Sequence, residues 1–132
     1  IVLGQGACTN SAYFSQYGIA GNFAPIADYA TLKRAVDECE KRGLNYKVGN
    51  ILSSDVFYSE KGMEGTLEWA KLGVLAVEME AAALYMNAAR AGKKALAICT
   101  ISDLLIGGAV TTAEERQTAF HDMMQVALTI AE

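Results

Sequence analysis

Apolar and polar positions along the chain predict strands and helices in alternation. The clearest helix runs from 28 to 42, because its apolar residues repeat at i, i+3, i+4 and i+7. Asp28 can cap the start of this helix, and Gly43 can end it. Strands are expected at 1–9, 44–53, 74–78 and 94–101, and further helices near 63–72 and 80–91.

A last helix is expected after Thr112, since Thr112 and Glu115 have the spacing of a capping box. Its expected buried residues are Phe120, Met123, Met124, Ala127, Leu128 and Ala131. The alternation of strands and helices predicts a single α/β domain over 1–132, with a sheet that is at least partly parallel. Gly4 and Gly6 in the first strand indicate a close backbone approach.

Polar clusters follow three of the predicted strands, at 53–55, 78–80 and 102–103. In a parallel sheet the carboxyl ends of the strands meet at one edge, and ligand sites gather there. The three clusters therefore predict a binding site at this edge. They do not name a reaction.

Glu78 and Glu80 are two residues apart, so in an extended chain their side chains point the same way. A carboxylate can accept hydrogen bonds from both neighbouring hydroxyls of a sugar, and Met79 between them could pack on its face. The alternative is structural. Glu80 would then only favour the start of the following helix, and Glu78 would pair with a lysine or arginine.

Asp103 follows an apolar strand, and Ser102 lies beside it. A partly buried carboxyl group can act as a general acid, because burial disfavours its charged form. The alternative is an Asx-type cap of a loop. Arg116 falls in the first turn of the last helix, where a cation is poorly placed for the helix dipole. That misfit favours a functional role, and a solvated surface arginine is the ordinary alternative.

Other residues have plainer interpretations. Phe57 and Tyr58 follow a strand and could stack on a flat ring, although packing in a core is the more frequent role of such residues. Cys99 lies in a predicted buried strand, where inert packing is expected. His121 on the last helix is expected at the surface or internally bonded rather than as a base.

Composition narrows the class of protein. The chain has 132 residues, 52% of them hydrophobic, and a net charge of −4, which gives no reason to expect nucleic acid or an anionic membrane as partner. No apolar run reaches the roughly 18 residues of a transmembrane helix. Three cysteines without paired spacing favour a reduced, cytoplasmic compartment, and no metal site is expected. Because the chain starts at Ile1 inside a predicted strand, we expect the front of a larger protein to be missing.

Six segments, taken in their order along the chain, indicate a family: GQGACTNS, FAPIADY, VGNILSSDVFY, AVEMEAAALY, ICTISD and TTAEERQTAF. As a set they strongly resemble the bacterial DeoD-type, hexameric purine nucleoside phosphorylases. The resemblance covers nearly the whole chain, but only about the C-terminal half or more of the family's length. It implies a three-layer phosphorylase/hydrolase-like α/β fold with a mixed, barrel-like central sheet flanked by helices. The chain would be the C-terminal portion of that domain.

The activity implied by the resemblance is reversible phosphorolysis of purine ribo- and deoxyribonucleosides to the free base and (deoxy)ribose 1-phosphate, in purine salvage. Matching positions imply the substrate contacts. Glu80 would hold the ribose hydroxyls, with Met79 against the sugar and Glu78 nearby at the sugar and base. Val77 and Phe57 would line the base pocket.

The resemblance implies that Asp103 is the general acid toward purine N7, with Ser102 beside it. Arg116 would approach Asp103 when the last helix segment closes. Inorganic phosphate would be the co-substrate, with no cofactor, and the protein would be a homo-oligomer, a hexamer by resemblance. The family's phosphate-binding arginines lie in its front portion, outside this chain.

Two alternatives remain open from the sequence. A nucleosidase acting on methylthioadenosine or adenosylhomocysteine shares the fold and the Ser-Asp pair, but it uses water in place of phosphate. The TTAEERQT segment with its arginine looks more like the phosphorylase. The second alternative is a non-catalytic fragment that self-associates through exposed strand edges.

Overall fold

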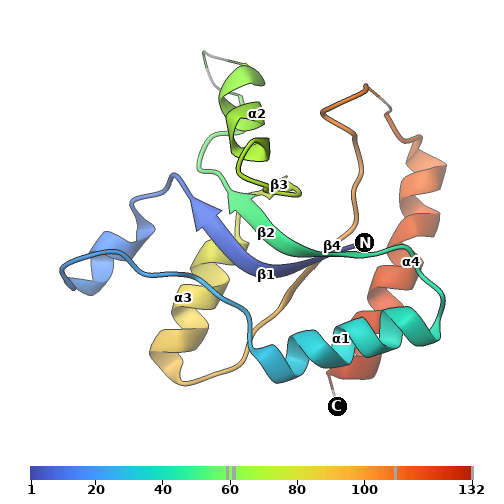
Figure 1. Cartoon of the computed structure of the whole chain (residues 1–132), viewed down its shortest axis with the longest axis horizontal. Helices are drawn as coiled ribbons and strands as arrows, with labels where there is room; N and C mark the ends of the chain where they lie inside the picture. The colour runs from blue at the N-terminus through green and yellow to red at the C-terminus, as the bar shows by residue number, and fades with distance from the viewer. Residues whose placement is uncertain (59, 61, 109, 132) are drawn as a thin grey trace.

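Four strands form one sheet with helices on both faces in the computed structural model, which describes residues 1–58, 60, 62–108 and 110–131 (Figure 1). The elements in chain order are β1 (Val2–Thr9), the 3-10 helix η1 (Tyr13–Tyr17), α1 (Tyr29–Lys41), β2 (Lys47–Ser53), α2 (Glu64–Ala70), β3 (Val77–Glu78), α3 (Ala81–Ala91), β4 (Ala97–Cys99) and α4 (Ala113–Ile130). The predicted alternation of strands and helices is confirmed.

The strand order in the sheet is β3-β2-β1-β4. β1 pairs in parallel with β2, and β2 in parallel with β3, whereas β4 runs antiparallel to β1. The sheet is therefore mixed, and its carboxyl-terminal edge is shared only by β1, β2 and β3. A register shift between Gly4 and Gly6 interrupts the pairing of β1 with β2. This bulge changes the alternation of faces, so Val2 and Ala7 lie in the same core.

Gly4 lies where side chains from β2 and α3 approach β1 closely. The Tyr85 hydroxyl donates a hydrogen bond to the Gly4 carbonyl and accepts one from the Ala97 amide at 2.9 Å. A Cβ atom at position 4 would lie 2.8 Å from Ile51 Cδ1 and 3.1 Å from the Tyr85 hydroxyl oxygen. Side chains rather than another backbone approach Gly4, and Tyr85 ties β4 to β1. The predicted backbone approach is found at Gly6, where a Cβ atom would lie 3.5 Å from the Pro25 carbonyl oxygen.

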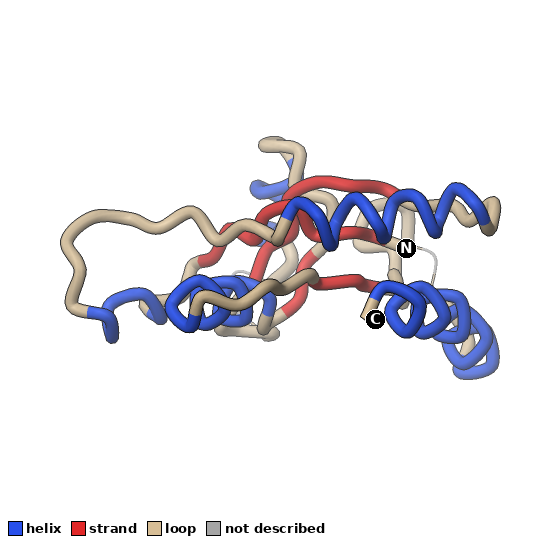
Figure 2. Tube along the Cα trace, turned by 90° about the horizontal axis from the view of Figure 1, so that it is seen from below, coloured by secondary structure: helices blue, strands red, loops and turns tan. Residues whose placement is uncertain are grey.

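The sheet separates two hydrophobic cores, with helices on each side. Figure 2 shows the helices packed around the strands. One core joins β1 and β2 to α3, and the other joins β1 to α1 and α4. The buried residues of the first core are Val2, Ala7, Ile51, Ala81, Ala82, Tyr85 and Met86. Those of the second are Leu3, Leu32, Ala35, Cys39, Val126 and Ile130.

The predicted helix caps are confirmed at both long outer helices. Asp28 accepts a hydrogen bond from the Thr31 amide at the start of α1, and Gly43 adopts the left-handed conformation just beyond its end. Thr112 and Glu115 form the reciprocal bonds of a capping box at the start of α4.

The predicted buried face of α4 is largely wrong. Of the side chains described on α4, Val126 and Ile130 are buried and Met123 and Ala127 partly buried, whereas Met124 is 48% and Leu128 67% exposed. Phe120 and Ala131 are also exposed. Because α4 packs on α1 and β4 along a narrow stripe, the deeply buried positions among its described side chains are four residues apart. Hydrophobicity alone could not select this stripe.

Smaller differences concern lengths. The segment 10–27 contains η1, and Ile26 in it forms an isolated bridge with Gly6. β3 has two residues rather than the five predicted. Among the helices in the described ranges, none is long and apolar enough to cross a bilayer.

Candidate active site

The carboxyl ends of β2 and β3 lie side by side, because the parallel register pairs Ser53 with Glu78. Thr9 at the end of β1 donates its hydroxyl to the Ser53 carbonyl at 2.7 Å. The Ser54 amide donates to the Glu78 carbonyl at 2.9 Å. The predicted meeting of the clusters at 53–55 and 78–80 is thus confirmed.

Glu78 is occupied within the protein. Its Oε1 accepts a hydrogen bond from the Ser53 hydroxyl, and its Oε2 accepts from the amides of Glu80 and Ala81, both at 2.7 Å. These amides lie at the start of α3, where helix N–H groups lack partners within the helix. Among the residues that the structure describes, the ion pairs include none between Glu78 and a lysine or arginine, so that alternative is not supported there. The backbone of α3 and a serine satisfy this carboxylate.

Glu80 is the N-cap residue of α3, but its side chain makes no capping hydrogen bond. The sequence alternative had Glu80 stabilising the start of α3. In the structure the Glu78 side chain does this instead. Glu80 is exposed, and its neighbours Met79 and Val77 are 42% and 38% exposed. This leaves an accessible carboxylate beside two accessible apolar side chains at the end of β3.

The end of β4 lies within electrostatic range of both glutamates. Burial raises the pKa of the Cys99 thiol, and the charges of Glu78 and Glu80 raise it further. A thiol with a raised pKa is a poor nucleophile, which agrees with the packing role expected for Cys99. The chain then continues past Cys99 toward Ser102, and Figure 1 shows this segment passing the sheet before it reaches α4.

The prediction that residues 102–103 share one sheet edge with the other two polar clusters is wrong. β4 is antiparallel to β1, and Cys99 pairs with Val2 at the beginning of that strand. Ser102 and Asp103 therefore do not belong to the shared carboxyl edge of β1, β2 and β3. They follow a strand of opposite direction, and only the electrostatic proximity of Cys99 relates them to the glutamates.

Asp103 is exposed, contrary to the partial burial considered from the sequence. Its Oδ2 accepts a hydrogen bond from the Ser102 hydroxyl at 2.8 Å, and its backbone forms an isolated bridge with Val110. The Thr111 amide and hydroxyl both donate to the Ser102 carbonyl and close this loop. Arg116 is half-buried on α4. The ion pairs of the described residues do not include one between it and Asp103.

Phe57 and Tyr58 are 73% and 89% exposed, so the core role favoured for them is wrong. Their rings meet edge to face with centroids 4.7 Å apart. The loop that carries them is held to β1 by Asn10, whose side-chain oxygen accepts from the Asp55 amide at 3.1 Å. His121 is exposed, as expected.

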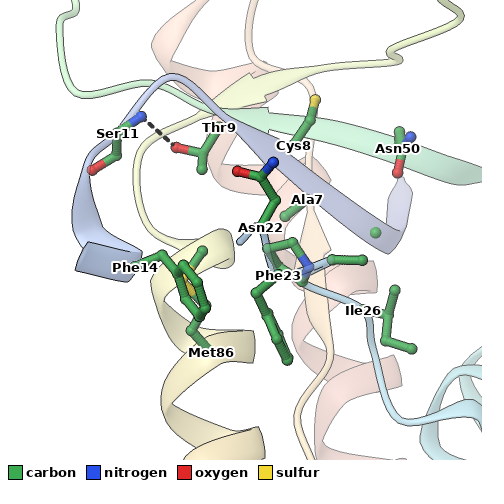
Figure 3. Close-up of a pocket in the computed structure, with 13 residues that line it drawn as sticks. Ala7, Cys8, Thr9, Ser11, Phe14, Asn22, Phe23, Ile26, Asn50 and Met86 are labelled. Atoms are coloured by element: carbon green, nitrogen blue, oxygen red, sulfur yellow. Dashed lines mark hydrogen bonds between the residues drawn. The ribbon is translucent and has the colours of Figure 1, made fainter. Parts of the chain in front are cut away.

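Two cavities in the described part of the chain lie beside these residues rather than on them. One, of about 550 Å³, lies between the end of β2 and α2, and its lining includes Ser54, Tyr58 and Trp69. The other, of about 410 Å³, is lined by β1, the 22–26 segment and α3. Figure 3 shows Phe14, Phe23 and Met86 on its wall. Neither lining includes Glu80 or Asp103.

Sequence reasoning missed the importance of Ser53. It is 4% exposed, and its hydroxyl donates to Glu78 and accepts from the Ala82 amide at 2.8 Å. A serine at the end of a predicted strand was the available signal, but the partners lie 25 and 29 residues away. Among the described residues, no group of three or more histidine, cysteine, aspartate or glutamate side chains could hold a metal ion.

A mixed sheet between two helix layers defines an α/β protein. The chain belongs to the phosphorylase superfamily, whose family model matches residues 4–132.

Within this superfamily, the chain is similar to purine nucleoside phosphorylases of the DeoD type. The chain is 48% identical over 132 residues to the DeoD-type purine nucleoside phosphorylase of Clostridium novyi, covering 100% of this chain and 56% of the relative. It is 48% identical over 129 residues to that of Xenorhabdus nematophila, covering 97% and 53%. The resemblance drawn from the six segments is confirmed. The chain spans about half the length of these relatives.

A solved structure agrees on the fold. The purine nucleoside phosphorylase of Toxoplasma gondii, solved in complex with immucillin-H, superposes with a TM-score of 0.84. The match covers 98% of this chain and 53% of that one, at 16% sequence identity. The expected phosphorylase-like α/β fold with a mixed sheet is therefore confirmed.

Proposed function

We propose that the protein catalyses reversible phosphorolysis of purine ribo- and deoxyribonucleosides. The observation that carries this proposal is the exposed carboxylate of Glu80 at the end of β3, beside the accessible apolar side chains of Val77 and Met79. Asp103, an exposed carboxylate that accepts a hydrogen bond from Ser102, supplies the second group. One carboxylate is assigned to the sugar and the other to the base. The DeoD-type relatives, 48% identical, bear the name of this activity.

The sugar side is assigned to the end of β3. Glu80 accepts hydrogen bonds from the ribose hydroxyls, and a charged acceptor makes these bonds stronger than a neutral one would. Met79 packs against the sugar, and Val77 with Phe57 lines the place of the base. The partial exposure of Val77, Met79 and Phe57 supports this assignment, because apolar side chains open to solvent can be covered by a ligand.

The base side is assigned to Asp103. A phosphate oxygen forms a bond to C1′ while the bond from C1′ to N9 breaks and its electron pair moves into the purine. A proton from Asp103 to N7 lets the base leave as a neutral molecule. A positioned general acid contributes about 10²–10⁴-fold to such a step. The hydroxyl of Ser102, bonded to Asp103 at 2.8 Å, orients its carboxyl group.

Arg116 is assigned to the same step. It lies near the start of α4, the helix that follows the Asp103 loop, and approaches Asp103 when that segment closes. Asp103 must gain its proton before the cation arrives, because a nearby positive charge favours the ionised carboxylate. Once in place, the arginine stabilises the carboxylate that remains after proton transfer.

Inorganic phosphate is the proposed co-substrate, without a cofactor. By resemblance, its binding residues belong to the portion of the relatives that this chain does not span. We also propose a homo-oligomeric state for the whole protein, in the cytoplasm.

The test is release of free base from inosine and adenosine, measured with and without phosphate. Phosphate-dependent release with formation of ribose 1-phosphate is the expected result. Release at the same rate without phosphate would assign the protein to the nucleosidases. No release from either nucleoside, in protein of verified mass and fold, would overturn the proposed activity.

A further inference from the structure

The carboxylate of Glu78 is shared among three donors from two distant parts of the chain. Oε1 accepts from the Ser53 hydroxyl on β2, and Oε2 accepts from the amides of Glu80 and Ala81 at 2.7 Å each. Ser53 in turn accepts from the Ala82 amide at 2.8 Å. Three consecutive amides at the start of α3 are thus satisfied by two side chains.

These bonds replace an ordinary helix cap. The N-cap position of α3 is Glu80, whose own side chain makes no capping bond. A helix start needs acceptors for its first amides, and an acidic acceptor is favoured there by the helix dipole. Ser53 and Ala82 are buried, at 4% and 2% exposure, so water cannot readily replace a lost partner.

The same bonds determine where Glu80 stands. Its backbone amide is held by Glu78, and Glu78 is held by strand pairing to Ser53 on β2. Glu80 is therefore joined to the sheet on one side and to α3 on the other. Its side chain is left exposed, while the accepting positions of Glu78 are directed into the protein.

We propose that Glu78 and Ser53 are positioning residues that cap α3 and hold Glu80 for its sugar contact. In this arrangement Glu78 does not itself bind the sugar or base, although family resemblance places it there. The proposal rests on the proposed function in one respect only, the role of Glu80 as the sugar ligand. The capping itself is independent of any substrate.

Amide hydrogen exchange tests the capping without a ligand. Replacing Glu78 by alanine should speed exchange at Glu80 and Ala81 by about tenfold or more, since each amide loses its hydrogen bond to a charged acceptor. Ser53→Ala should have its largest effect at Ala82. Glu78→Gln should restore much of the protection, because one amide oxygen can accept from both N–H groups.

Two control variants test whether the exchange changes are specific to the Glu78 and Ser53 bonds. Glu80→Gln should leave the three amides unchanged, since the Glu80 side chain makes no capping bond. Glu115→Ala should speed exchange at the start of α4 alone, because it removes the capping box there. Unchanged exchange at Glu80 and Ala81 in the Glu78 variants would overturn the capping. If Glu78→Ala fails to fold, Glu78→Gln and Ser53→Ala still decide the matter.

Binding separates positioning from direct contact. The affinity of the complete protein should be measured for inosine and for its free base, hypoxanthine. Glu80→Gln and Glu78→Ala should both weaken inosine binding by about tenfold or more with little change for hypoxanthine, and Glu78→Gln should retain most inosine affinity. A purely structural role would weaken both ligands equally, and that result would overturn the proposal.

One further outcome distinguishes direct binding by Glu78. If Glu78→Gln loses inosine affinity as severely as Glu80→Gln while exchange in α3 is unchanged, Glu78 contacts the sugar and the proposal is wrong. If the wild-type protein binds neither inosine nor hypoxanthine, the proposed function fails, and with it the link from the cap to sugar binding. The exchange data would still decide whether Glu78 and Ser53 cap α3.

Discussion

Glu78 and Asp103 are both carboxylates at the end of an apolar strand, yet their surroundings differ. Glu78 is half-buried and accepts bonds from Ser53 and from two amides of α3. Asp103 is exposed, and its side chain accepts a bond from the adjacent Ser102. In the proposed function, the carboxylate with many partners positions the site, and the exposed one is the group proposed to react. Charge and position at a strand end do not by themselves distinguish these roles.

The largest expected effect concerns the open carboxylate. Asp103→Asn should lower kcat for inosine phosphorolysis by about 10²–10⁴-fold, because an amide cannot donate the acid proton to N7. KM for inosine should change far less. Steady-state kinetics would show this, with Asp122→Asn on the exposed surface of α4 as a matched control. Equal losses in the two variants would contradict the role of Asp103.

A smaller loss of activity is expected for Arg116, which is proposed to act with Asp103. Arg116→Ala should lower kcat by about tenfold to a hundredfold, because the product carboxylate of Asp103 loses a charge-assisted hydrogen bond. In the double variant with Asp103→Asn, removing the arginine should cost little more, because the two residues act in one step. Independent losses in that double-mutant cycle would argue against this coupling. Arg90→Ala, at a cation lying 5.9 Å from the Tyr17 ring centre, is the control.

The two faces of α4 offer a similar contrast in packing. Val126 is fully buried, whereas Leu128 is 67% exposed. Val126→Ala should lower the free energy of unfolding by about 2 kcal/mol, since it removes two buried methyl groups and leaves a cavity. Leu128→Ala should stay within about 0.5 kcal/mol. Urea unfolding of both variants would check this. A larger loss of unfolding free energy in Leu128→Ala than in Val126→Ala would support the buried face predicted from hydrophobicity.

The smallest effect concerns the local cap of α4. The bond from the Thr112 amide holds the pKa of Glu115 below its usual value. The ionised form is thus favoured on folding, so its stabilising effect is present above the ordinary pKa and is lost as pH falls through the lowered one. Glu115→Gln should therefore lose less stability between neutral pH and about pH 3. Parallel acid titrations of urea-induced unfolding would reveal a difference, and identical pH profiles would show that this cap contributes nothing.

The caps of α3 and α4 show what sequence reasoning could and could not predict about the site. Thr112 and Glu115 are three residues apart, so their reciprocal bonds follow from local spacing. Ser53 and Glu78 are 25 residues apart, and only the parallel pairing of β2 with β3 makes them neighbours. From the sequence, Glu78 was expected to face a cation or a sugar, because the donors of α3 could not be assigned to it.

By itself, the sequence determined the order of elements, the caps of α1 and α4, the backbone approach at Gly6 and the family, because local spacing and short motifs carry that information. Tertiary structure decided the direction of β4, the buried stripe of α4 and the partners of Glu78. Each of these depends on contacts between segments far apart in the chain. The type of a side chain determines whether it requires an apolar environment or a polar partner. Only the fold decides which distant group provides it.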